Sequence, residues 1–262
     1  MHTDSSEFMS RIFDLLDRVE YRRIQTAEDM EAVGRVRAKA YKEVNLAPVK
    51  GDVMIDEVDF DPQCYVFGIF HDEQLISTIR IHHVTPDHPV SQTGKVFPTE
   101  VQQFLDAGMV LIDPTRLASD TEAFKELPGM HLLTMRLAVI ACEFFKADRC
   151  LSMVVPHHGP FYRRMIESRL VAAPTTGSGL YSQPLQLMAS DFPNSRERIY
   201  RRLPFLHAHS YEMRMLFGDL TAFPSAPLTI LPTARYASDF GRSQLPGANR
   251  AVEQPALEPA IQ

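Results

Sequence analysis

The chain has 262 residues, enough for one sizeable domain or two small ones, and its 45% hydrophobic and 23% charged residues are typical of a globular protein with a buried core. Its formal net charge of −6 gives no overall positive field, which argues against nucleic acid as a partner. Arginine clusters within residues 163–169 and 196–202 still offer a local basic patch to an acidic protein, or else form solvated helix faces.

The cysteines and the apolar runs bear on location. Cys64, Cys142 and Cys150 lie in apolar runs without paired spacing, so we expect free thiols in a reducing compartment rather than disulfides or a zinc site. No secretion signal is recognisable, and no apolar run approaches the roughly 20 residues that span a bilayer. We therefore expect a cytoplasmic protein without a bound metal or an integral membrane segment.

The first half of the chain predicts helix, strand, helix and hairpin in that order. Apolar residues at helical spacing predict an amphipathic helix over residues 6–18, which packs on the domain or, alternatively, makes a peripheral membrane contact. A strand over residues 21–25 leads to a helix that begins after Thr26, with Asp29 completing a weak capping box. Strand patterns over residues 65–70 and 74–84 flank a short polar turn and predict an antiparallel hairpin.

The second half alternates strands with helices. A polar loop leads to a short helix near residues 101–106 and a strand over residues 109–118. Proline cannot donate to a ladder, so we expect this strand to bulge or to separate from its neighbour at Pro114. The remaining elements are a buried helix over 131–146, a strand over 150–155, a helix from about 159, a strand over 185–189 and a basic helix over 194–203. We expect an amphipathic helix within residues 1–20, one mixed α/β domain over 21–222 and a Pro-rich extended or disordered tail over 223–262.

Two arginines fall on faces that are otherwise apolar. Arg37 shares a helical stripe with Met30 and Tyr41, and strand alternation places Arg80 on the same face as Ile76. A guanidinium keeps its charge when buried, so each arginine needs an anionic or hydrogen-bonding partner unless it reaches the surface. A core ion pair would satisfy Arg80 equally well.

Carboxylates occur in nearby segments. Asp56 and Asp59 precede the hairpin in an acidic stretch that otherwise reads as a solvated loop and lacks the spacing of a calcium site. Asp113 and Arg116 would point to opposite faces of a regular strand, whereas a bulge at Pro114 would bring both to one cleft. A charge-compensated cleft is the simplest arrangement that satisfies these groups.

In this pattern the chain resembles the acyl-homoserine-lactone synthases and the long-chain N-acyl amino acid synthases, two related families with the GNAT fold. The resemblance runs from about residue 21 to about residue 191. Its motifs are Arg37 followed four residues later by Tyr41, Asp56-x-x-Asp59 ahead of Tyr65, the strand arginine Arg80, and Asp113-x-x-Arg116, which is similar to a Glu-x-x-Arg motif.

The resemblance implies an α/β (α+β) fold with a central mixed, mostly antiparallel sheet, flanked by helices and splayed at a mid-strand bulge that binds a pantetheine thioester. The chain lacks tryptophan and has Asp113 in place of glutamate, which resembles the N-acyl amino acid synthase branch more closely than the lactone synthases. It also lacks a glycine-rich phosphate loop after the strand. That absence favours an acyl-carrier-protein donor.

The implied activity is transfer of a long-chain fatty acyl group from the phosphopantetheine of acyl-carrier protein, or alternatively from acyl-CoA, to the amine of an amino acid. No cofactor is expected to stay bound. The alternatives are an acyl-homoserine-lactone synthase-like autoinducer synthase, and a non-catalytic module that binds acyl chains or a carrier protein.

The resemblance and the chemistry of amine acylation suggest roles for the candidate residues. Asp113 is the expected general base, with His82 or His83 in reserve, because an ammonium must lose a proton before it attacks. Tyr162 is the expected acid for the leaving thiolate, or else a packing aromatic. Arg80 and Arg116 are further catalytic candidates, and together with Arg37 they are expected to bind the acceptor's carboxylate or to order the acidic loop. The substrate-binding candidates are Arg37, Tyr41, Asp56, Asp59, His82 and His83, of which the aspartates orient arginines.

Overall fold

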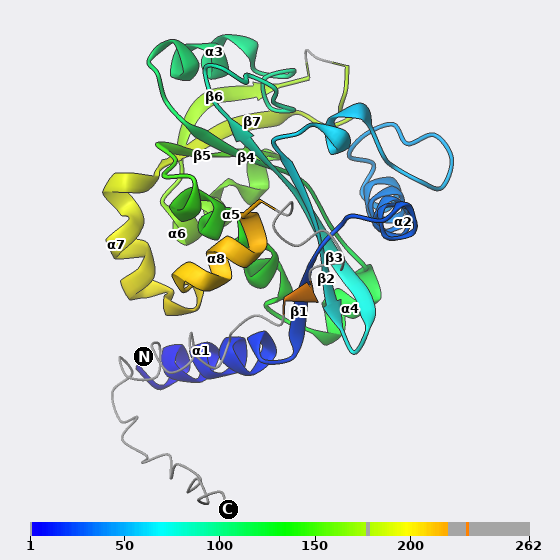
Figure 1. Cartoon of the computed structure of the whole chain (residues 1–262), viewed down its shortest axis with the longest axis vertical. Helices are drawn as coiled ribbons and strands as arrows, with labels where there is room; N and C mark the ends of the chain where they lie inside the picture. Colours follow the sequence, from blue (N-terminus) through cyan, green and yellow to red (C-terminus); the bar gives the residue numbers. More distant parts are fainter. Residues whose placement is uncertain (1, 177–178, 220–228, 231–262) are drawn as a thin grey trace, which may run out of the picture.

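The computed structural model describes residues 2–176, 179–219 and 229–230 (Figure 1). The strands are β1 (Val19–Arg23), β2 (Cys64–His71), β3 (Gln74–Val84), β4 (Leu111–Ser119), β5 (Arg149–Val154), β6 (Arg169–Thr175), β7 (Leu185–Asp191) and β8 (Thr229–Ile230). The α-helices are α1 (His2–Leu16), α2 (Ala27–Glu43), α3 (Pro98–Asp106), α4 (Thr121–Glu126), α5 (Met130–Phe144), α6 (Gly159–Ile166), α7 (Phe192–Arg202) and α8 (Ser210–Phe217). Short 3-10 turns are η1 (Glu57–Phe60), η2 (Pro156–His158) and η3 (Pro204–Leu206).

The strands form one mixed sheet in the order β6-β7-β5-β4-β3-β2-β1-β8. The pairing is antiparallel except between β4 and β5, which run parallel. That parallel pair is brief, because only Leu111 with Arg149 and Ile112 with Cys150 are in register. Beyond them β4 continues beside β3 and β5 continues beside β7, so the sheet splays between its two central strands.

Helices cover both faces of the sheet (Figure 1). On one face, α5 lies across β3, β4 and β5, and α1 and α8 complete the larger core around it. On the other face, α2 lies across β3 and β4, and α3 packs over a second core with β5 and β7. The expected mixed α/β fold, with a mostly antiparallel sheet and flanking helices, is therefore confirmed.

Local signals explain most of the elements. Thr26 caps α2, since its side chain accepts a hydrogen bond from the Asp29 amide at 3.1 Å. The continuous apolar sequence of α5 matches its burial, with every side chain from Leu132 to Cys142 buried. Among the described residues, no helix has both the length and the apolar character needed to cross a bilayer.

Three elements do not follow from the sequence patterns. The edge strand β6 is mostly exposed and α4 and α8 are short, so each lacks the long apolar periodicity that identifies an element. The Pro-rich tail expected over residues 223–262 lies outside the described residues apart from Thr229–Ile230, which pair with β1. The division of the chain into an N-terminal helix, a domain and a tail, with boundaries after residues 20 and 222, stays a prediction.

Candidate active site

A cavity of about 430 Å³ opens where β4 and β5 diverge. Its walls come from β4 beyond Pro114, the end of β5, the last turn of α2 and the start of α6. Strand pairing satisfies backbone groups in a regular sheet, and no pair joins β4 to β5 beyond Ile112 and Cys150 in the part of the chain described. Backbone groups at this edge are therefore available to a ligand.

The pairing of β4 with β5 ends at Ile112, just before Pro114, as one of the two expectations had it, whereas the bulge in β4 lies at Arg116 and Leu117. Arg80 stands opposite Thr115 and Thr78 stands opposite Ala118, so two residues of β4 face one residue of β3. Arg116 has a positive φ of 53°, the left-handed conformation found in the G1 type of bulge. Pro114 stays in register with its partner on β3, because its missing N–H faces the splayed edge without cost to the β3 ladder.

The bulge turns Arg116 towards a buried charge network under α2. Arg37 donates to Asp59 at 2.8 Å, and Arg80 donates to Asp56 at 2.6 Å while lying 3.3 Å from Asp59. Arg116 donates to the second oxygen of Asp56 at 2.6 Å. The five residues form one continuous network, so the structure brings together the arginines and the acidic stretch singled out in the sequence.

The acidic stretch reaches this position through a local turn. Asp56 caps η1, where its side chain accepts from the Val58 amide while Asp59 accepts from the Asp56 amide. This reciprocal cap points both carboxylates at the arginines. Burial opposes ionisation of Asp56, but Arg80 and Arg116 outweigh it and hold the pKa of that carboxyl at about 2.

The network is not saturated. Within the described residues, hydrogen bonds are missing at Arg37 Nε and Nη2, at one terminal nitrogen of Arg80 and at Arg116 Nε. Three guanidinium groups face two carboxylates in this set, so one formal positive charge remains. The side chain of Arg116 is 10% exposed and lines the cavity, which makes it the point where the network meets the cavity.

Asp113 lies beside this network but not on the cavity wall. Its carboxylate accepts hydrogen bonds from the Ser91 hydroxyl at 2.7 Å, from the Thr93 amide at 3.0 Å and from the Thr93 hydroxyl. Its side chain is buried, and these bonds fix the loop before α3 onto β4. Asp113 therefore has a structural role that the sequence pattern did not indicate.

The two reserve histidines lie on opposite faces of β3. His82 is fully buried opposite Asp113, with Nε2 3.5 Å from Asp61, and burial lowers its pKa. His83 faces the α5 side, where its ring stacks on Phe145 at a centroid distance of 4.2 Å. The structure therefore does not bring His83 to the candidate site, as strand alternation requires for neighbouring residues.

Aromatic side chains complete the cavity. Tyr41 and Tyr162 line it, and the Arg116 guanidinium lies 5.7 Å from the centre of the Tyr41 ring. Burial raises the pKa of Tyr162 well above its usual value, so its hydroxyl keeps its proton. Burial also raises the pKa of Tyr181, which follows a turn without a recognisable motif, to about 12.

Two further residues were missed in the sequence. His157 and His158 follow β5 and line the cavity. Partial burial and the neighbouring His157 lower the pKa of His158, so its neutral form predominates near pH 7. Adjacent histidines directly after a continuous apolar strand were the signal that could have identified them.

Comparisons with known proteins agree with this geometry. In fold, the chain is similar to FeeM, an N-acyl amino acid synthase from uncultured soil microbes, with 18% identity, a TM-score of 0.58 and coverage of 69% of this chain and 95% of that one. It is also similar to the acyl-homoserine-lactone synthase LasI, with 15% identity, a TM-score of 0.51 and coverage of 77% and 94%. A third similar structure is BjaI, a CoA-dependent acyl-homoserine-lactone synthase, with 12% identity, a TM-score of 0.51 and coverage of 71% and 89%.

Sequence comparison identifies the family. Among curated proteins, none matches the chain. The model of the N-acyl amino acid synthase FeeM family matches residues 32–191, more than half of the chain, and this range contains the splayed strands, the charge network and the cavity. The chain therefore belongs to the FeeM family of N-acyl amino acid synthases and is an acyltransferase with a GNAT-like fold.

Proposed function

We propose that this enzyme transfers a long-chain fatty acyl group from acyl-carrier protein to the amine of an amino acid. The observation that carries the proposal is the cavity between β4 and β5, which has largely apolar walls, a strand edge without a partner, and Arg116 in its lining. A thioester needs the first two features and an amino acid carboxylate needs the third. The three cysteines of the chain are free thiols, which fits our proposal that the enzyme works in the cytoplasm.

The donor's pantetheine arm would lie along the splayed edge of β4. The amides of the pantetheine arm can pair with backbone groups of β4 that lack a strand partner there. A backbone N–H of the strand can polarise the thioester carbonyl. Leu117, Met153 and Leu185 supply apolar surface for the acyl chain.

The start of α5 favours a carrier-protein donor over coenzyme A. Coenzyme A carries a pyrophosphate, which proteins bind at glycine-rich helix N-termini. Here Gly129 precedes α5 with a positive φ, and Ile12 of α1 packs so closely that a Cβ at Gly129 would clash with it. Ile12 therefore covers the glycine at this helix end. Arg163 and Arg169 make no ion pair within the described residues and would be free to meet an acidic carrier.

The acceptor's carboxylate would bind Arg116. A guanidinium matches a carboxylate in a bidentate geometry, and the remaining positive charge of the network would be neutralised by it. Tyr41, next to the Arg116 guanidinium, would pack on the acceptor. Arg37 and Arg80, with Asp56 and Asp59, would hold Arg116 in position.

The chemical step requires a base and an acid. The amine loses a proton and its lone pair forms the C–N bond, the C–S bond then breaks, and the thiolate takes a proton. Tyr162 is the proposed acid, because its hydroxyl stays protonated and lines the cavity. For the base we propose His158 rather than Asp113, because His158 lines the cavity in its neutral form while hydrogen bonds occupy both oxygens of Asp113.

The test is a transfer assay with purified protein. The protein is incubated with palmitoyl-carrier protein or palmitoyl-CoA and mixed amino acids, and thiol release and product mass are followed. We expect thiol release only with an acceptor present, faster with the carrier donor, and the mass of an N-acyl amino acid. Tight carrier binding without thiol release would contradict transfer and favour an acyl sensor, and a lactone formed from S-adenosylmethionine would replace the proposed acceptor.

A pair of variants separates the two candidate bases. His158→Ala should lower kcat about 100-fold and remove the rise in rate with pH, while Asp113→Asn should keep that rise because its oxygens hold a loop. A pH profile that loses its rise in Asp113→Asn but not in His158→Ala would return the role to Asp113.

A further inference from the structure

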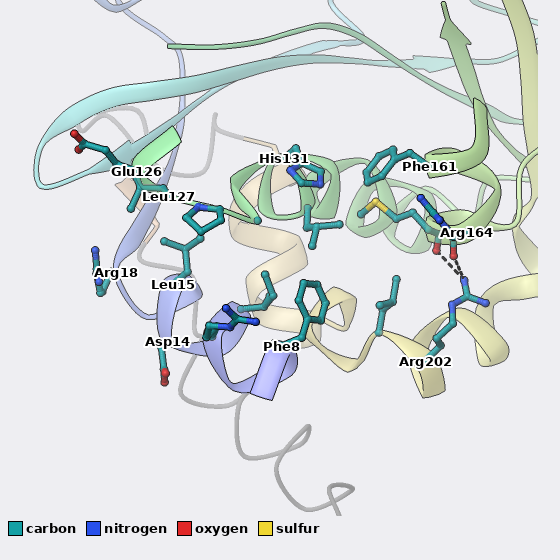
Figure 2. A pocket seen from close by; sticks show the side chains of 17 residues that line it. Phe8, Asp14, Leu15, Arg18, Glu126, Leu127, His131, Phe161, Arg164 and Arg202 are labelled. Carbon is teal, nitrogen blue, oxygen red and sulfur yellow. Dashed lines mark hydrogen bonds between the residues drawn. The ribbon is translucent and has the colours of Figure 1, made fainter. Parts of the chain in front are cut away.

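A second, larger cavity lies beneath the N-terminal helix. It measures about 650 Å³ and is enclosed by α1, the start of α5, α6 and the end of α7. Figure 2 shows Phe8 and Leu15 of α1 on one side of it and His131 and Phe161 on the other. Its volume is within the range of roughly 300–1,000 Å³ that is usual for small-molecule sites.

The walls of this cavity are apolar. Ile12 and Leu15 come from α1, Leu132 from α5, and Phe161 and Met165 from α6. These side chains converge from helices that are far apart in the sequence, so the cavity exists only because α1 packs across the domain. Such walls suit a hydrocarbon chain.

The rim carries more cations than anions. Four arginines line it against Asp14 and Glu126: Arg11, Arg18, Arg164 and Arg202. Arg18 hydrogen-bonds to His71. Arg202 donates to the main-chain oxygens of Arg164 and Met165, and Figure 2 draws these two bonds as dashed lines.

Two of these arginines make no side-chain contact with a polar partner among the described residues. Within the described residues, neither Arg11 nor Arg164 forms an ion pair or a side-chain hydrogen bond. A hydrocarbon chain alone would need no cation at its mouth. The combination of apolar walls and unpaired guanidinium groups fits a molecule with both an anionic and an apolar end.

This cavity is separate from the one between β4 and β5. The two have no lining residue in common, and α6 lies between them. Tyr162 faces the cavity between the strands, while Phe161 and Met165 face the cavity beneath α1. A donor bound along β4 therefore does not account for the cationic rim.

We infer that the cavity beneath α1 binds an amphipathic carboxylate, a molecule with one carboxylate head and a long acyl chain. The chain lies between α1 and α6, and the head meets Arg11 and Arg164. A free fatty acid and an N-acyl amino acid share this chemistry, and the second of these ligands rests on the proposed function. Occupation by the product would couple its accumulation to the packing of α1 on the domain.

The test measures binding to the full-length protein without any acyl donor. Isothermal titration with palmitate and with N-palmitoylglycine should each show a site that remains in Ala40→Trp, and at this site the methyl ester of palmitate should bind at least about tenfold more weakly because it has no charge. Tighter binding of one acid than of the other identifies the source of the ligand. Equal binding of the ester would overturn the role of the arginines.

Variants locate the site. The double variant Arg11→Glu and Arg164→Glu should weaken palmitate binding at least about tenfold, while Arg201→Glu, a matched change at an arginine of α7 outside the cavity, should leave it unchanged. Ala40→Trp, which fills the cavity between β4 and β5, should also leave it unchanged. Loss of binding in Ala40→Trp but not in the double variant would overturn the inference.

Two controls separate the remaining outcomes. Both arginines are exposed, so the melting curve of the double variant should match that of the wild type. Binding to phosphatidylglycerol vesicles without binding of monomeric palmitate would overturn the inference in favour of a membrane surface. Palmitate binding by a protein that transfers no acyl group would leave this inference intact and reject the proposed function, since binding is measured without transfer.

Discussion

Two buried arginine clusters lie on opposite faces of the same sheet and differ in how completely they are satisfied. On the α5 face, Arg136 donates to both oxygens of Glu212, at 2.6 and 2.9 Å, and to the main-chain oxygens of Phe205 and His207. On the α2 face, the network that includes Arg37 and Arg80 leaves several N–H groups without a partner among the described residues.

The difference separates a structural ion pair from a binding network. Arg136 and Glu212 are both fully buried, and their pairing joins α8 to α5. The network on the α2 face keeps an unbalanced positive charge and reaches the cavity through Arg116. A buried charge without full compensation costs free energy, so its retention indicates a ligand that completes it.

The largest effect is expected at the satisfied cluster. Arg136→Ala leaves Glu212 as a buried, unpaired carboxylate and should lower the free energy of unfolding by about 3 to 5 kcal/mol. Urea denaturation of the folded variant measures this. The double variant Arg136→Met with Glu212→Leu removes both charges and should recover most of the loss, and a loss below about 1 kcal/mol in Arg136→Ala would break the comparison.

The next effect separates activity from stability. Arg116→Ala removes the contact with the acceptor and should lower kcat/KM for the amino acid about 100-fold, while the free energy of unfolding falls by no more than about 1 kcal/mol because Asp56 keeps Arg80. Arg116→Lys keeps the charge, so its kcat/KM should lie between that of Arg116→Ala and that of the wild type. A destabilisation as large as that of Arg136→Ala, with normal activity in the remaining folded protein, would assign the network to stability alone.

Acid unfolding sharpens the comparison through Asp56. Its pKa is about 2 in the folded protein against an ordinary value of 3.8, so the ionised carboxyl stabilises the fold above about pH 3.8, and this contribution is lost as the pH falls towards 2. We expect the ionised carboxyl of Asp56 to contribute about 1 to 2 kcal/mol to the free energy of unfolding. This figure is discounted for solvent screening because the side chain is partly exposed. Asp56→Asn should be less stable than the wild type at pH 5 and the difference should shrink towards pH 2, whereas a constant difference would contradict the assignment.

The smallest effect belongs to the satisfied cluster. The Tyr21 hydroxyl donates to the Leu133 carbonyl at 2.9 Å beside Arg136, and both groups are buried. Tyr21→Phe leaves that carbonyl to its helical partner and should cost about 1 kcal/mol, without a change in activity. Thermal melting and the transfer assay together measure this, and an activity loss would show that the two faces are coupled.

Much of the fold could be predicted because its strongest elements have strong local patterns. The apolar stretch of α5, the hairpin of β2 and β3 and the cap of α2 are each encoded within a short window. The exposed edge strand β6 has no such pattern. Proline marks a missing donor and so predicts a bulge or a separation of strands at Pro114. Among the described residues β4 has no β5 partner beyond Ile112, but the register shift against β3 occurs at Arg116, where tertiary contact with Asp56 stabilises a positive φ.

The candidate site could be predicted in part for a related reason. A charged residue on an apolar stripe is visible in the sequence, and Arg37, Arg80 and Asp59 do meet. Partners on distant loops are not visible, so the bonds from Thr93 to Asp113 could not be expected. Residues without a periodic pattern, such as Tyr181, are likewise recognised as part of the site only from the structure, which shows them lining the cavity between the separated strands.

The most direct test asks where the donor lies. A palmitoyl-pantetheine thioether with a diazirine beside the sulfur can be photolysed on the protein, and the labelled residues can be located by mass spectrometry. We predict labels within β4 and β5, at residues 111–119 and 149–154, that disappear in Ala40→Trp. Labels confined to α1 and α7, or unaffected by Ala40→Trp, would contradict donor binding between the splayed strands.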